Sequence, residues 1–125
     1  MSEVRRLERE EDLEAVLTAE LALIYKHSPR CAQSLYARGQ VIRVAELEGR
    51  VPLYIVDVVG NRDVSNAVAR RVGVPHESPQ VILLRCGETV WHASHGRVRT
   101  RAIAAAIAAI DASPPAAAGL DDWGS

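Results

Sequence analysis

The chain has 125 residues, enough for one domain and too few for an enzyme of several domains. Its 15 Lys and Arg residues nearly balance 16 Asp and Glu residues, which disfavours a nucleic-acid binder. Its two cysteines, Cys31 and Cys86, are too few for a disulfide scaffold or a four-cysteine zinc site. The charged N-terminal sequence and the shortness of every apolar run predict a cytoplasmic protein with reduced thiols and no membrane partner.

Apolar periodicity divides the chain into alternating strands and helices. In order, it predicts an edge strand (4–7), a helix (10–20), a buried strand (21–25), a helix after Cys31, a buried strand (53–59), a helix from Asn61 to Gly73, two strands (80–85 and 89–94) and a helix capped by Thr100. The gap between the last two strands is short enough for a hairpin. The order (β)αβαβαββα predicts an α/β fold, in which helices cover both faces of a mixed sheet.

Two further details of these elements can be compared with the structure. In the helix after Cys31, the spacing of Leu35, Gly39 and Ile42 predicts the buried side. After a domain of residues 1–110, residues 111–125 contain paired prolines and small residues without periodicity. We expect these residues to form a disordered tail, in which Trp123 is exposed to solvent or docks on a partner.

Cys31 is the main candidate for a catalytic residue, because it lies between a predicted buried strand and the start of a helix. Open α/β sheets place their functional sites at that edge. A thiol at a helix N-terminus faces unpaired N–H groups, which favour the nucleophilic thiolate, and Lys26, His27 and Arg30 add positive charge nearby. We therefore expect the pKa of Cys31 to lie below the free value of about 8.5. The alternative is that Cys31 is a buried small hydrophobe, and His27 is either a proton-transfer group or a hydrogen-bonded residue at the strand end.

The residue three positions after Cys31 is Ser34 and not a second cysteine. A mixed disulfide on Cys31 must then be resolved by another thiol, while Ser34 either donates a hydrogen bond to the sulfur or caps the helix. The strand from Pro79 to Cys86 spans roughly 23 Å at about 3.3 Å per residue. A disulfide needs Cα atoms within about 7 Å of each other. If Pro79 lies beside Cys31, the two cysteines cannot pair within one chain.

Three segments occur together in an order that carries a family resemblance, namely Lys26–Cys31, Asn61–Asn66, and His76–Gln80 followed by Trp91–His95. Together they resemble the YtxJ-like family of the bacillithiol system, the monothiol bacilliredoxins. The resemblance implies a thioredoxin-like fold and a thiol–disulfide oxidoreductase. Cys31 would take bacillithiol, or a similar low-molecular-weight thiol, from S-thiolated cytosolic proteins, and a second thiol would then free it.

The resemblance also implies a substrate-binding loop opposite the active cysteine. Ser78 and Pro79 match the position of the cis-proline loop of this fold. Ser78 would offer backbone hydrogen bonds to an extended disulfide substrate, and the nearby His76 is a candidate substrate contact. The alternative is an ordinary trans proline that opens a strand.

Other polar residues carry weaker indications of function. His92 and His95 are three residues apart on a strand, so they point to opposite faces, and we expect no metal site. Asp57 fits a hydrogen-bonded turn residue better than a general base.

Two alternatives to the oxidoreductase remain. One is a module that binds a metal or iron–sulfur cluster through Cys31, and the other is a redox-inert adaptor. A basic cluster precedes the last predicted helix and consists of Arg97, Arg99 and Arg101. Such a cluster usually indicates a solvated surface and less often a site for an anionic thiol.

Overall fold

The computed structural model describes residues 4–111, so the expected tail after residue 111 and Trp123 lie outside the described residues. The described elements, in chain order, are β1 (Val4–Arg6), η1 (Glu10–Asp12), α1 (Leu13–Thr18), β2 (Leu21–His27), α2 (Ala32–Leu47), β3 (Leu53–Asp57), α3 (Arg62–Val72), β4 (Gln80–Arg85), β5 (Glu88–Ser94), η2 (His95–Arg97) and α4 (Thr100–Asp111). In this part of the chain no helix is both long and apolar enough to cross a bilayer.

The strands form one mixed sheet in the order β1-β3-β2-β4-β5. The three strands β1, β3 and β2 are parallel, whereas β4 and β5 run antiparallel to their neighbours, which confirms the predicted sheet. The β4–β5 turn contains Cys86 and Gly87, both with positive φ. A Cβ atom on Gly87 would lie 2.6 Å from the carbonyl oxygen of Leu17, so this turn has room only for glycine at that position.

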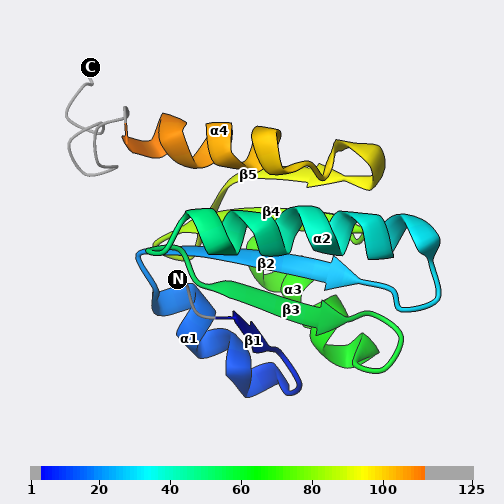
Figure 1. Ribbon diagram of the computed structural model, residues 1–125. Coiled ribbons are helices and arrows are strands. Elements are labelled where there is room, and N and C mark those ends of the chain that lie inside the picture. The colour runs from blue at the N-terminus through cyan, green and yellow to red at the C-terminus, as the bar shows by residue number, and fades with distance from the viewer. Residues whose placement is uncertain (1–3, 112–125) are drawn as a thin grey trace.

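Helices cover both faces of the sheet, as predicted, with α2 and α4 on one side and α1 and α3 on the other (Figure 1). Because side chains alternate along a strand, Leu23 of β2 packs under α2 and α4 while Ile24 packs under α1 and α3. Both side chains are fully buried. Each such side chain stabilises the fold by about 1.5–3 kcal/mol relative to an exposed one.

The buried side of α2 differs from the one predicted. Leu35 is 57% exposed. The buried residues instead include Ser34, Ala37, Val41 and Val44, one step around the helix from the predicted stripe. Apolar residues occupy both sides of α2, so their spacing alone does not distinguish the two sides.

Several helix ends also differ from the pattern. The first helical segment starts as the 3-10 turn η1, in which the Asp12 N–H donates to the Arg9 carbonyl. The Asp12 carboxylate also accepts hydrogen bonds from the backbone N–H groups of Glu8 and Arg9. Thr100 is the first residue of α4 and not its cap, since its N–H and hydroxyl both donate to Gln40 of α2. Asn61 precedes α3 without a side-chain capping bond.

Candidate functional site

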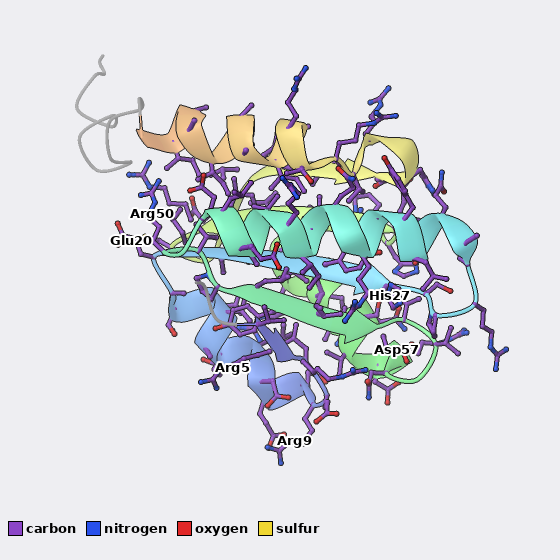
Figure 2. All side chains as sticks on the ribbon, viewed as in Figure 1. Arg5, Arg9, Glu20, His27, Arg50 and Asp57 are labelled. Carbon is purple, nitrogen blue, oxygen red and sulfur yellow. The ribbon has the colours of Figure 1, made fainter. Side chains whose placement is uncertain are left out.

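The carboxyl ends of the two central parallel strands meet at one edge of the sheet. His27 at the end of β2 pairs with Asp57 at the end of β3, and Figure 2 shows both side chains at this edge. Lys26 pairs with Gln80, the first residue of β4, which brings the preceding residue Pro79 to the same edge. The peptide bond between Ser78 and Pro79 is cis, which confirms that prediction.

Cys31 lies at this edge, directly before the first turn of α2. Its backbone N–H donates to the carbonyl of Ser28 at 3.2 Å, and its own carbonyl accepts the N–H of Leu35. The side chain is partly exposed. Hydrogen bonds from the backbone N–H of Ser34, then from that of Gln33, and from the Ser34 hydroxyl lower the pKa of the Cys31 thiol. The thiolate is therefore favoured by donors at the helix start, as expected.

Ser34 connects this thiol to the strand beneath it. Its side chain is fully buried, and its Oγ accepts the backbone N–H of Ser28 at 3.3 Å. Its carbonyl oxygen accepts the hydroxyl of Tyr25 at 2.6 Å. The Ser34 hydroxyl thus donates to the Cys31 sulfur, whereas its Oγ accepts an N–H from the turn before α2 and forms no side-chain cap of that helix.

Tyr25 is a member of this site that the sequence analysis missed. It lies in an apolar run, and the available indication was that a buried tyrosine hydroxyl needs a hydrogen-bond partner. The hydroxyl also lies 3.3 Å from Nδ1 of His27. Burial raises the pKa of Tyr25 to about 12. Burial, and then the nearby Arg38, lower the pKa of His27, so its imidazole is neutral near pH 7.

Lys26 points to the opposite face of β2, away from this group. It is fully buried, and its Nζ lies 3.1 Å from Nδ1 of His76, which in turn lies 3.2 Å from the hydroxyl oxygen of Ser65 in α3. Burial lowers the pKa of Lys26 to about 8. The expected positive charge beside the thiol does not come from this side chain, because its amino group meets His76 and not Cys31. Arg30 is exposed at the turn before Cys31.

The segment before β4 is tied to its neighbours on both sides. His76, itself an exposed residue, reaches Lys26, while Gln80 Nε2 donates to the Pro75 carbonyl at 3.0 Å. The N–H of His95 donates to the Pro79 carbonyl at 2.9 Å. The structure thus brings His76, Ser78 and Pro79 to the same sheet edge as Cys31.

The structure also shows the surroundings of Asp57 and of the two cysteines. Asp57 is a turn residue, since its Oδ1 accepts the N–H groups of Val59 and Gly60 at 2.8 and 2.9 Å. Cys31 and Cys86 are both free, and β4 separates the Pro79 edge from Cys86, which agrees with the expectation that they do not pair. Among residues 4–111, no three His, Cys, Asp or Glu side chains are gathered so that they could hold a metal ion.

Comparison with known proteins identifies the family. The sequence profile of the family described as "Monothiol bacilliredoxin BrxC" matches residues 5–103. The chain belongs to this bacilliredoxin family. Membership gives it a thiol redox role with a low-molecular-weight thiol, and the family resemblance inferred from the sequence is confirmed.

Solved structures confirm the thioredoxin-like fold. A thioredoxin-fold protein assigned as an oxidoreductase is 29% identical, with a TM-score of 0.77 over 83% of this chain and 93% of that one. A mutant thioredoxin from Halobacterium salinarum is 19% identical, with a TM-score of 0.74 over 92% and 98% of the two chains. Thioredoxin from Trypanosoma brucei brucei is 14% identical, with a TM-score of 0.71 over 86% and 90%.

Proposed function

We propose that this protein is a monothiol thiol–disulfide oxidoreductase that removes bacillithiol, or a similar low-molecular-weight thiol, from mixed disulfides on cytoplasmic proteins. The observation that carries the proposal is the environment of Cys31. Its thiol is partly exposed at the start of α2, and three hydrogen-bond donors lower its pKa. The thiolate is the form that attacks disulfides, and access decides which disulfides it can reach.

The reaction consists of two thiol–disulfide exchanges. In the first, the Cys31 thiolate attacks the low-molecular-weight sulfur of the mixed disulfide, and the protein thiolate leaves and takes a proton from water. In the second, a free low-molecular-weight thiolate attacks the sulfur joined to Cys31. This step forms a low-molecular-weight disulfide and returns the Cys31 thiolate. The cysteine of the substrate protein is reduced, one free low-molecular-weight thiol is oxidised as it joins the thiol taken from the protein, and Cys31 ends unchanged.

The side chains near Cys31 have different roles in this proposal. Ser34 and the backbone N–H groups of the first turn stabilise the thiolate, both as the attacking group and as the leaving group. The edge at Ser78 offers backbone groups to an extended substrate segment. Leu35 and Tyr36 are 57% and 63% exposed in the first turns of α2. They give the substrate protein an apolar contact close to the thiol.

The test is an intact-mass experiment on the reduced protein. Wild type, Cys31→Ser and Cys86→Ser are each incubated with bacillithiol disulfide and, separately, with glutathione disulfide. We expect one adduct per chain in wild type and in Cys86→Ser, and none at the active position in Cys31→Ser, with faster formation from bacillithiol disulfide. Cys86→Ser is the matched control, because it removes the other thiol, which is exposed at the far end of β4. Absence of any Cys31 adduct would overturn the proposal.

A further inference from the structure

An apolar hollow lies between β5 and the last turns of α4, which run alongside each other in Figure 1. It has a volume of about 230 Å³ and is lined by Arg85, Val90, Trp91, Ala106, Ala109 and Ile110. We refer to it as the α4–β5 hollow. Small-molecule sites usually have volumes of about 300–1,000 Å³. The hollow is therefore better suited to a side chain of a polypeptide than to a cofactor or a substrate.

Several apolar side chains around this hollow are left uncovered. Val90 is 48% exposed, and Ala109 is exposed on the surface of α4. Trp91 and Ile110 are only partly buried where they pack against the core. β5 pairs with β4 alone and so forms an edge of the sheet. An edge strand with exposed apolar residues invites pairing with other chains unless another segment covers it, so a covering segment is expected here.

The chain continues from the rim of this hollow. α4 ends at Asp111, directly after two of the lining residues, and Pro114 and Pro115 then lack the N–H groups that further helical turns need. Residues 112–119 span at most about 26 Å when fully extended. The lining residue Ala106 is only about 8 Å back along α4 from the end of the helix. The sequence beyond residue 119 can therefore reach every part of the hollow.

The segment Leu120–Trp123 matches the hollow in its chemistry. Its leucine and its tryptophan are the two large apolar residues of the sequence after residue 111, and two aspartates stand between them. A tryptophan side chain can bury about 150–250 Å². Arg85 is the one charged residue that lines the hollow, and a guanidinium pairs well with carboxylates. Both the apolar surface and the charge of the hollow thus have a counterpart in this segment.

We propose that the segment Leu120–Trp123 docks in the α4–β5 hollow of its own chain. Trp123 covers Val90 and the neighbouring apolar side chains, and the two aspartates face Arg85. The docked segment closes the open edge of β5, so that this edge does not pair with other chains.

The docked segment stays away from the thiol. Arg85 is the last residue of β4 and lies about 17 Å along this strand from Gln80, which is at the edge of the sheet that holds Cys31. The segment is therefore a cover for the opposite end of the domain, and the reactions of Cys31 do not depend on it.

A double-mutant cycle on the full chain tests the contact, with urea unfolding followed by far-UV circular dichroism. Trp123→Ser should lower the urea midpoint, because it removes the docked side chain. Ala109→Glu places a charged side chain in the hollow, so that Trp123→Ser should have no further effect in this background. Ala108→Glu is the matched control, because Ala108 is exposed on the same helix and lies outside the lining of the hollow. In that background, Trp123→Ser should keep its full effect.

Fluorescence gives a second measurement of the same contact. Trp91→Phe leaves Trp123 as the single tryptophan and keeps an aromatic ring in the hollow. The Trp123 emission maximum should lie at a shorter wavelength in the folded protein than in urea, and acrylamide should quench it less. Adding Ala109→Glu should move the maximum to the value found in urea. Arg85→Gln should move it by less, since an exposed ion pair is weak, and added salt should act in the same direction.

Three results would overturn the proposal. In the first, Trp123 emits in the folded protein as it does in urea, or Trp123→Ser lowers the urea midpoint equally in the Ala109→Glu and Ala108→Glu backgrounds. In the second, the shift in Trp123 emission grows with protein concentration, which would place the segment on a second copy of the chain. In the third, Trp123→Ser slows adduct formation at Cys31 with glutathione disulfide, which would place the segment at the thiol edge.

Discussion

Tyr25 and Lys26 are consecutive residues of β2, and each is the centre of a different polar network on a different face of the sheet. Tyr25 donates its hydroxyl to the carbonyl of Ser34, in the first turn of the helix that follows Cys31. Lys26 reaches His76, in the segment that leads to Pro79, and His76 reaches Ser65 of α3. One strand end therefore holds both halves of the site, the thiol helix on one face and the proline segment on the other.

The two networks differ in how they respond to protons. Tyr25 has a pKa of about 12 and stays neutral over the physiological range. Lys26 has a pKa lowered to about 8 by burial, and no carboxylate among residues 4–111 pairs with it. The Tyr25 network is thus a fixed support for the thiol, whereas the Lys26 network titrates in the range where thiols also titrate. Changes to each residue can test this difference.

The largest expected effect is the pH dependence of stability that comes from Lys26. Its folded pKa of about 8 lies below its ordinary value of 10.5, so between these pH values the unfolded chain binds more protons. Stability should therefore rise with pH across this range, by on the order of 3 kcal/mol in total for this group. In Lys26→Met that contribution is absent.

Urea unfolding of wild type and Lys26→Met at pH 7, 8, 9 and 10 measures this contribution. Lys26 is the single lysine of the chain, and the difference between the two proteins cancels the titration of tyrosines and cysteines. The free energy of unfolding of wild type, relative to that of Lys26→Met, should increase steadily above pH 8. If the free energies of unfolding of the two proteins change in parallel with pH, the Lys26 amino group is not desolvated in the folded protein.

The next largest effect is expected for Tyr25→Phe at neutral pH. The change removes the hydroxyl that donates to the Ser34 carbonyl at 2.6 Å. The free energy of unfolding should fall by about 1–2 kcal/mol, the range for a buried hydrogen bond. Tyr36→Phe is the matched control, because Tyr36 is 63% exposed and should change stability by less than about 0.5 kcal/mol. Equal effects in the two variants, measured by urea unfolding, would contradict the supporting role of Tyr25.

The smallest effect is a change in the titration of the thiol itself. Ser34→Ala removes the hydroxyl donor, while the backbone N–H groups of Ser34 and Gln33 remain. The pKa of Cys31 should rise and yet stay below its ordinary value. The pH dependence of alkylation by iodoacetamide, in the Cys86→Ser background, gives this pKa directly. Ser28→Ala is the control, because it keeps the backbone N–H that donates to Ser34, and it should leave the pKa of Cys31 unchanged. If Ser28→Ala shifts this pKa as much as Ser34→Ala does, the cause is a disrupted turn and not the loss of one donor.

Much of the fold was predictable because its signals are local. The continuous apolar runs that became β2 and β3 identified two buried parallel strands, and the position of Cys31 after the first of them placed the thiol at the functional edge of the sheet. The cis bond before Pro79 came from the family resemblance and not from any feature of the residues themselves.

The contacts within the site were less predictable, because a strand buried on both faces has no visible alternation of polar and apolar residues. The sequence placed Lys26 near Cys31, but alternation along β2 turns its amino group to the other face. Tyr25 was missed because its partner is the backbone carbonyl of Ser34, nine residues away. The exposure of Leu35 was missed because a polar residue, Ser34, takes the buried position in that turn.

The position of β2 in the sheet determines how long the site stays folded when the protein partly opens. β2 is paired along both sides and lies between two core layers, whereas β1 has three residues and one neighbour. Amide hydrogen exchange should therefore be slowest in β2 and fast in β1, since strands open in order of their packing. Cys31 follows the strand that opens last. The lowered pKa of its thiol should then persist through partial opening of the sheet and return to the ordinary value only when the whole domain unfolds.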